Sequence, residues 1–244
     1  GRGTLWDKNN GTKYVGEWHE GIKEGFGMEY FENGRVYIGE YKAGKCHGHG
    51  TMLDGQHVIY RGEWNNGYRH GHGISIYREE TFEDDKNNTE RKYVYTKFEG
   101  HFVHGKKHGY GALTNDTEGT VQKGTWHDDV PTSGKWRIQN ERDGSVYCGH
   151  VMVVRSDGSD EDDLMKIMAV PHGFGSMKYG NGDNYSGMFE LGDRTGEGVC
   201  VFANGDKWEG DWTKDEMDTN GNGILTKVDG TVKHFVRSSF VPTW

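Results

Sequence analysis

A pattern of aromatic and glycine residues that recurs along the chain constrains its fold more than any other feature. Residues 60–73 show it in full, as Tyr-Arg-Gly-Glu-Trp-Asn-Asn-Gly-Tyr-Arg-His-Gly-His-Gly. The pattern returns after 23 to 25 residues, except for two steps of 38 residues. A fixed period indicates one small structural unit that is stacked many times. The first residues of the eight expected units are Tyr14, Tyr37, Tyr60, Phe98, Gln122, Tyr147, Tyr185 and Trp208.

Each unit is expected to fold as a β-hairpin. Side chains of a strand alternate between its two faces, so Tyr60, Gly62 and Trp64 share one face and the charged residues between them share the other. Asn65-Asn66-Gly67 supplies the turn, because glycine adopts a positive φ without strain. The return strand begins at Gly71-His72-Gly73. The gap that Gly62 leaves on the aromatic face is expected to hold a ring from a neighbouring strand.

Composition supports a thin aromatic core. The chain has 40 Gly but only 3 Pro, which argues against collagen, and its 13 Tyr, 10 Phe and 8 Trp argue against disorder. A single hairpin is only marginally stable, so neighbouring hairpins must share their core. We therefore predict an all-β fold, an elongated single-layer twisted antiparallel sheet of stacked β-hairpins over residues 1–244. A half unit (1–11) precedes the array and a strand-like piece (231–236) follows it.

The unit resembles the MORN (membrane occupation and recognition nexus) repeat, whose pattern is close to YxGxWxxGxxxGxG. The best matches are residues 14–27, 37–50, 60–73, 98–111 and 185–198. The resemblance implies a solenoid with an aromatic-lined concave groove. It also implies a role similar to those of MORN arrays in axonemal spoke proteins, junctional membrane proteins, protist cytoskeletal scaffolds and regulatory regions of some lipid kinases and lysine methyltransferases.

Two adjacent units depart from the pattern. The unit that starts at Gln122 has Asp129 in place of the turn glycine, one additional residue and Pro131. The unit that starts at Tyr147 has Val151 in place of its second aromatic residue and then a long insertion. We expect the array to bend or loosen here.

Two insertions, at residues 78–97 and 152–170, break the period. The first is dense in charges of both signs and is expected to be a solvated loop or an extended hairpin tip. The second contains an acidic run (160–163) and then Leu164, Ile167 and Met168 at helical spacing. Two interpretations of the second insertion stay open: a loop whose apolar end packs on the sheet, or a docking element for a partner.

Histidines at repeated positions look like a metal cluster. His47, His49, His70 and His72 fall in register on neighbouring units, but no Cys or carboxylate completes a tetrahedral set at a recognisable spacing. Polar residues beside the repeat glycines are expected to face solvent instead. We expect no metal and no cofactor.

Residues 218–229 resemble a calcium loop, with Asp218, Asn220, Asn222, Gly223 and Asp229 at ligand and turn positions. The repeat already accounts for these glycines, and no flanking helix is predicted, so calcium binding is left open. Nucleophile-elbow, phosphate-loop and zinc-protease motifs are absent from the sequence. We expect no catalytic residue, and the chain is predicted not to be an enzyme.

Net charge limits the classes of partner, and the cysteines indicate the cellular compartment. A net charge of −9 disfavours nucleic acid and weakens the case for anionic lipid. No apolar run approaches the roughly 18 residues of a membrane span. The three cysteines lie far apart and outside any Cys-x-x-Cys motif, which indicates a reducing compartment. We expect a cytoplasmic protein, and the family resemblance suggests association with the cytoskeleton or a cilium.

The leading hypothesis is a protein-interaction scaffold, a rigid rod whose aromatic row docks a helix or an extended peptide of another protein within a larger assembly. The short apolar segment of the second insertion is a further docking candidate, through Leu164, Ile167 and Met168. The expected anchors of the row are Tyr14, Trp18, Tyr37, Tyr41, Tyr60, Trp64, Phe98, Phe102, Tyr185, Phe189, Trp208 and Trp212.

Three alternatives remain. The first is a phosphoinositide-binding or membrane-tethering module, with local basic patches such as Lys106-Lys107 and Arg91-Lys92. The second is the regulatory MORN region of a larger enzyme, because Gly1-Arg2-Gly3 begins in the middle of a unit. The third is end-to-end self-association, since an open sheet leaves unpaired strand edges.

Overall fold

The chain is all-β, as predicted. A computed structural model describes residues 1–85, 88–155 and 167–237, and these residues contain 20 strands and no helix. The strands form one open antiparallel sheet of stacked hairpins. The chain divides into two compact units that are described separately here: unit 1 comprises Gly1–Glu118 and Trp126–Asp129, and unit 2 comprises Gly119–Thr125 and Val130–Trp244.

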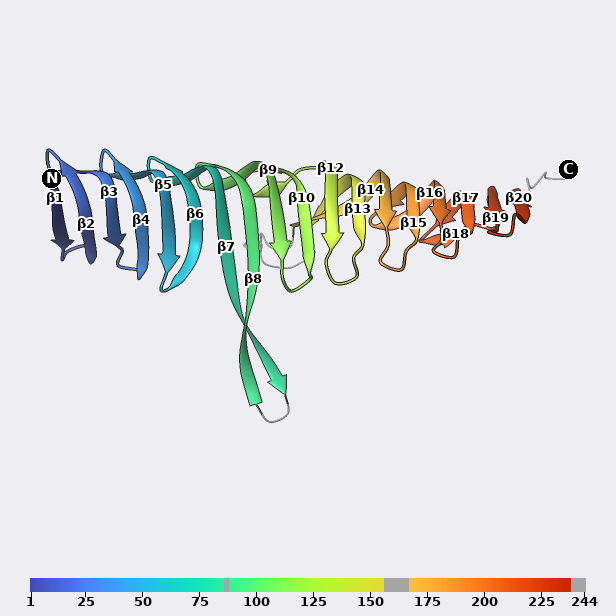
Figure 1. The fold of residues 1–244 in the computed structure, drawn as a ribbon, viewed down its shortest axis with the longest axis horizontal. Coiled ribbons are helices and arrows are strands. Elements are labelled where there is room, and N and C mark those ends of the chain that lie inside the picture. The colour runs from blue at the N-terminus through green and yellow to red at the C-terminus, as the bar shows by residue number, and fades with distance from the viewer. Residues whose placement is uncertain (86–87, 156–166, 238–244) are drawn as a thin grey trace, which may run out of the picture. The chain divides into compact units, whose positions relative to one another are not determined.

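In unit 1, each strand lies antiparallel to its neighbour in sequence (Figure 1). The first strand pairs Gly3 with Gly16, so the predicted half unit adds a strand to the first hairpin. The strands are β1 (Arg2–Asp7), β2 (Thr12–His19), β3 (Ile22–Tyr30), β4 (Arg35–Lys42), β5 (Lys45–Asp54), β6 (His57–Asn65), β7 (Tyr68–Asp85), β8 (Asn88–Val103) and β9 (Lys106–Asn115).

Strand β10 (Thr120–His127) begins in unit 2 and ends in unit 1. Unit 2 repeats the same antiparallel pairing and ends with the predicted terminal strand, which pairs with β19. Its further strands are β11 (Val130–Pro131), β12 (Gly134–Asn140), β13 (Val146–Arg155), β14 (Ile167–Lys178), β15 (Asn184–Glu190), β16 (Asp193–Val201), β17 (Lys207–Thr213), β18 (Glu216–Met217), β19 (Gly223–Thr226) and β20 (Val232–Phe235).

The turns that join the strands of a hairpin use two successive residues with positive φ. Asn66 has a φ of 52° and Gly67 a φ of 88°. Two positive φ values in succession give the turn a twist that matches the right-handed twist of the strands. The predicted turn chemistry of residues 65–67 is therefore confirmed.

Aspartate replaces the turn glycine in two hairpins. Asp129 has a φ of 72° and Asp215 a φ of 68°, although both carry a Cβ that disfavours this region. In each case the carboxylate Oδ1 accepts a hydrogen bond from a backbone N–H of the preceding hairpin, Lys107 at 2.8 Å and Arg194 at 2.9 Å. The sequence predicts that the array bends or loosens at the unit that contains Asp129. The hydrogen bond from Lys107 to Asp129 instead ties this turn to the preceding hairpin.

The aromatic rings on one face form the core of unit 1. Neighbouring rings meet edge to face, with centroids 5.0 to 5.4 Å apart and planes at 77 to 90°. This arrangement sets the positive edge of one ring against the negative face of the next. In spatial order the rings are Trp18, Tyr14, Tyr41, Tyr37, Trp64, Tyr60, Phe102, Phe98 and Trp126.

Unit 2 has a shorter version of the same core. Tyr147, Phe189, Tyr185 and Trp212 meet edge to face in that order, with centroids 5.1 to 5.2 Å apart. Trp208 packs against Phe235 of the terminal strand, 5.2 Å away. The last strand therefore supplies a ring to cover the end of the row.

Glycines of successive strands lie opposite one another beneath the rings. In unit 1, Gly62 pairs with Gly73, and a Cβ added to either would lie within 2.7 Å of the Tyr60 side chain. The Tyr60 hydroxyl then donates a hydrogen bond to the carbonyl of Glu63 at 2.9 Å. The gap at Gly62 is thus filled by a ring from its own strand, so the prediction of a ring from a neighbouring strand was wrong. The reason is that the ring lies along its own hairpin and covers both glycines.

The degenerate unit recovers its missing ring from a later position. Gln122 offers no ring, but Trp136 of β12 lies over Gly124, where an added Cβ would overlap the indole. Trp136 is buried, pairs with Gly149, and donates its Nε1–H to the carbonyl of Thr132 at 2.8 Å. Trp136 therefore stands at a strand position where other repeats have a glycine. Its ring fills the core above Gly124.

The two insertions extend hairpins. Residues 78–97 lengthen β7 and β8 into one hairpin whose pairing continues to Asp85 and Asn88 (Figure 1), which is the hairpin alternative. In the second insertion, Ile167 and Met168 begin β14 and pair with Arg155 and Val154 of β13. Their helical spacing does not produce a helix, because strand pairing with β13 sets their conformation. Leu164 and the acidic run 160–163 lie outside the described residues.

Candidate interaction surface

The aromatic residues predicted as anchors form the core of the sheet. Eleven of the twelve are buried, and Trp18 is half-buried. Of the predicted docking segment, Met168 is 39% exposed, and Leu164 lies outside the described residues. A contact role for these residues stays a prediction, and packing explains their recurrence without one.

Basic side chains cover much of the aromatic face. A Lys or Arg falls nine residues after the leading aromatic in four of the repeats, and its charged group lies over the rings. This position was not among the predicted site residues, although its fixed spacing is visible in the sequence. The pairs are Lys23 with Tyr14 at 5.0 Å, Arg69 with Phe102 at 5.3 Å, Lys107 with Trp126 at 4.8 Å, and Arg194 with Trp212 at 4.2 Å.

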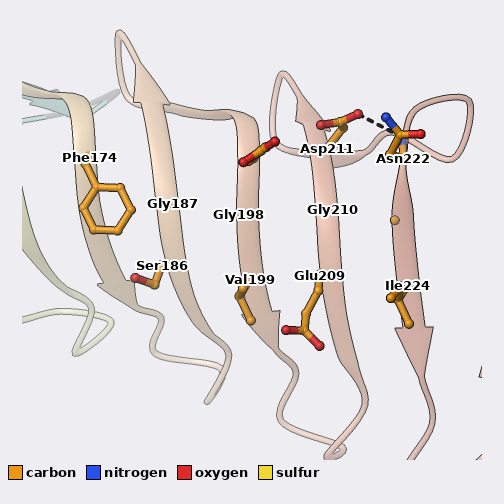
Figure 2. Close-up of a pocket in the computed structure, with 12 residues that line it drawn as sticks. Phe174, Ser186, Gly187, Gly198, Val199, Glu209, Gly210, Asp211, Asn222 and Ile224 are labelled. Carbon is orange, nitrogen blue, oxygen red and sulfur yellow. Dashed lines mark hydrogen bonds between the residues drawn. The ribbon is translucent and has the colours of Figure 1, made fainter. Parts of the chain in front are cut away.

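The opposite face, called here the outer face, carries a groove in unit 2. Figure 2 shows Phe174, Val199 and Ile224 projecting from β14, β16 and β19 on the same side of the sheet. Phe174 is 61% and Ile224 37% exposed. Backbone of the ladder glycines forms the floor, and the groove has a volume of about 540 Å³. Large apolar groups that remain exposed along a groove are typical of a contact surface.

The rim of this outer groove is acidic. Glu197, Glu209 and Asp211 line it, and no Lys or Arg is among its described lining residues. Glu197 lies opposite Asp211 in the strand register, and no ion-pair partner for Glu197 is present in the described residues. Asp211 accepts a hydrogen bond from the Asn222 N–H at 2.9 Å, drawn in Figure 2, and Glu209 pairs with Lys207 at 2.9 Å. The groove therefore combines apolar surface with negative charge.

Unit 1 has a hollow of about 580 Å³ on its own outer face. Val15, Phe26 and Ile38 line it, and Phe26 is 55% exposed. Arg2 is its charged lining residue, and no carboxylate lines it among the residues that the structure describes. The outer face thus offers apolar hollows in both units, with different charge.

The calcium-like loop uses its carboxylates for the fold. Asp218 Oδ1 accepts backbone N–H groups of Asn220 and Gly221 at 3.0 and 3.1 Å, and Asp229 Oδ1 accepts that of Thr231 at 2.8 Å. Asp218 and Asp229 belong to no cluster of three His, Cys, Asp or Glu ligands within the described parts of the chain. The loop geometry is explained by these turns.

The repeated histidines are also spread along the sheet. His49 lies 3.6 Å from Glu40, and the His72 ring meets that of His101 edge to face with centroids 5.8 Å apart. His47, His49, His70 and His72 form no three-ligand cluster in the part of the chain that is described.

The two buried cysteine thiols have raised pKa values. Burial raises the pKa of the Cys46 thiol to about 11 and also raises the pKa of Cys200. The thiolate is the nucleophilic form, and the raised pKa values favour the protonated thiol of both residues at neutral pH. All three cysteines are free, and Cys148 is exposed.

Stacked hairpins in one sheet, with glycine ladders beneath edge-to-face rings, define the chain as a β-hairpin repeat protein. The MORN repeat model matches residues 14–34, 37–55, 60–79, 98–116, 170–184 and 185–207, so the chain contains MORN repeats at these six positions. The predicted count of eight stays a prediction, since the units from Gln122 and Trp208 have no match of their own. No curated protein matches the chain. Within the described parts, no helix is long and apolar enough to cross a membrane.

Proposed function

We propose that the chain is a non-enzymatic protein-interaction module that docks partner proteins within a larger assembly. The observation that carries the proposal is the outer groove of unit 2, where exposed Phe174 and Ile224 and half-buried Val199 lie beside Glu197, Glu209 and Asp211. Most rings of the other face are buried in the core, so the proposal uses the apolar side chains that are exposed on the outer face.

The partner that fits is an extended segment with Lys or Arg residues beside apolar ones. Apolar side chains would contact Phe174 and Ile224, while its cations would face Glu197 and Asp211. Complementary charge favours orientation and association rate, and apolar contact favours affinity. The free cysteines support a reducing compartment, so a cytoplasmic location with a cytoskeletal or ciliary assembly is part of the proposal.

An array of extended peptides that combine Lys or Arg with Leu, Val or Phe tests this function. We expect the full chain to bind a subset of these peptides, with an affinity that falls as salt increases. The variant Glu197→Lys should lose at least tenfold in affinity. Glu190→Lys is the matched control, because Glu190 is an exposed acid of β15 that does not line the groove. Unchanged binding by the groove variant, or no bound peptide, would refute the proposal.

A second candidate function, phosphoinositide binding, is favoured by a hollow of about 740 Å³ in unit 1. It lies beside the long β7–β8 hairpin and is lined by Arg35, Arg69, Arg78 and His57, with Asp54 as its acidic residue. Guanidinium groups suit phosphates. Arg69 already donates to the carbonyl of Gly105 at 2.6 Å, so Arg78 is the better test. Vesicles that contain phosphoinositide should retain the wild-type chain and release Arg78→Glu. No retention of the wild type would eliminate this candidate.

A further inference from the structure

The turn after β10 brings two imidazoles and a carboxylate together within unit 1. His108 lies on β9, His127 ends β10, and Asp128 is the first residue of the turn. One ligand atom from each of these three residues lies within 4.8 Å of the other two. The ring centroids of His108 and His127 are 4.9 Å apart, and His108 Nδ1 lies 3.5 Å from Asp128 Oδ1.

The backbone holds this cluster in place. Asp129 donates its N–H to the carbonyl of Lys107 at 3.0 Å, and its Oδ1 accepts the N–H of Lys107 at 2.8 Å. These two bonds fix the turn that carries Asp128 against the strand that carries His108. The cluster is therefore set by the sheet and does not depend on flexible side chains meeting by chance.

The His108 ring has an unused polar atom inside this cluster. Its Nδ1 is buried and has no hydrogen-bond partner in the structure, although it points towards the Asp128 carboxylate. A buried polar atom without a partner is destabilising, so a ligand that binds this nitrogen stabilises the site. His127 and Asp128 are exposed, which leaves the cluster open to solvent.

We propose that His108, His127 and Asp128 form a binding site for a divalent transition-metal ion such as Zn²⁺. Zinc takes His nitrogens and carboxylate oxygens at about 2.0–2.2 Å, and sites with three protein ligands keep a fourth position for water. Ligand atoms of such a site are roughly 3.4 Å apart, so the side chains of exposed His127 and Asp128 must move closer by up to about 1.4 Å.

The ligand set selects the class of ion. Imidazole suits zinc, copper and nickel, whereas calcium and magnesium prefer oxygen ligands. Lys106 Nζ lies 3.7 Å from Asp128 Oδ2 and competes for the carboxylate. The site therefore binds an ion with affinity for imidazole rather than one that depends on carboxylate charge. Because the ligands come from β9 and from the end of β10, the ion links successive hairpins at the turn where Asp129 replaces glycine.

Titration of the metal-free full chain with Zn²⁺, followed by calorimetry, tests this site. We expect one equivalent to bind, and His108→Ala, His127→Ala and Asp128→Asn each to weaken binding by about tenfold or more. Co²⁺ should give the visible absorption of a four-coordinate site in the wild type and not in the variants. Thermal unfolding without metal checks that each variant is folded.

The matched control is His72→Ala. His72 and His101 form a second pair of neighbouring imidazoles in unit 1, with centroids 5.8 Å apart, and belong to no three-ligand cluster in the described residues. Zinc affinity should be unchanged in this variant. The proposal is overturned when the wild type binds no zinc, or when folded His127→Ala binds it as well as the wild type does, since the ion would then use others of the 13 histidines.

Discussion

The substitution Gly73→Ala tests whether ladder glycines exist to admit a ring. A Cβ at Gly73 would lie 2.6 Å from two carbons of the Tyr60 ring, and the three nearest atoms all belong to that side chain. The ring cannot move freely, because it is buried between Trp64 and Phe102, with both centroids 5.2 Å away. The new methyl group therefore forces Tyr60 out of the row.

The expected cost follows from the contacts that Tyr60 makes. Two edge-to-face contacts contribute about 0.5–1.5 kcal/mol each. The hydrogen bond to the Glu63 carbonyl adds about 0.5–1.5 kcal/mol. With about 1–3 kcal/mol for overpacking, Gly73→Ala should destabilise the chain by roughly 3–7 kcal/mol. At Gly67, nothing lies within 4 Å of an added Cβ, so Gly67→Ala should cost only the roughly 1–2 kcal/mol of its positive φ.

A double-mutant cycle with Tyr60→Ala isolates the ring as the cause. Tyr60→Ala alone should cost roughly 3–5 kcal/mol. In that background the space over Gly73 is empty, so Gly73→Ala should be nearly neutral, and the coupling should exceed about 2 kcal/mol. Urea unfolding followed by tryptophan fluorescence measures the four free energies. Additive costs, within about 0.5 kcal/mol, would refute the argument that the ring requires the glycine.

Two further predictions concern the anchored turn and alkaline pH. Asp215→Ala should destabilise unit 2 by roughly 2–3 kcal/mol, because Asp215 Oδ1 accepts the backbone N–H and the Nε–H of Arg194 at 2.9 and 3.0 Å. Asp215→Gly should cost about 1 kcal/mol less, since it relieves the positive φ; equal costs in urea unfolding would contradict this. Burial raises the pKa of Tyr147 and Tyr185 from 10 to about 12. The folded state then holds protons that the unfolded state has released, so the free energy of unfolding should fall between pH 10 and 12. Tyr185→Phe should reduce that fall in urea titrations at each pH, and an unchanged slope would contradict the assignment.

The hairpins could be predicted because their signals are local. Alternation in Tyr60-Arg61-Gly62 and the turn at Asn66-Gly67 are properties of a few adjacent residues, and stacking repeats them. Trp136 could not be predicted, because it supplies the ring for Gly124 from a position that glycine holds in other repeats. The anchoring role of Asp129 was also hidden, since its hydrogen bond joins two hairpins 22 residues apart in sequence.

The candidate interaction surface was harder to predict than the fold, for a related reason. Large aromatic residues attract attention as anchors, but whether a ring such as Tyr37 is accessible depends on the glycines and rings packed around it. Phe174 and Glu197 stand between the two glycines of a repeat, a position that the pattern leaves free. A position without a preferred residue carries no repeat signal, so the pattern does not identify it.

The two faces of the sheet therefore have different constraints. Each ring of the inner row packs on its neighbours, so substitution there changes stability in more than one hairpin. A change at an outer position alters only charge and apolar area at the surface. The outer hollows already differ in this way, since Arg2 lines the hollow of unit 1, whereas Glu197, Glu209 and Asp211 line the groove of unit 2. Because Arg2 pairs with Glu17 at 3.0 Å, the hollow of unit 1 has little free charge, and we expect cationic partners to prefer the acidic groove of unit 2.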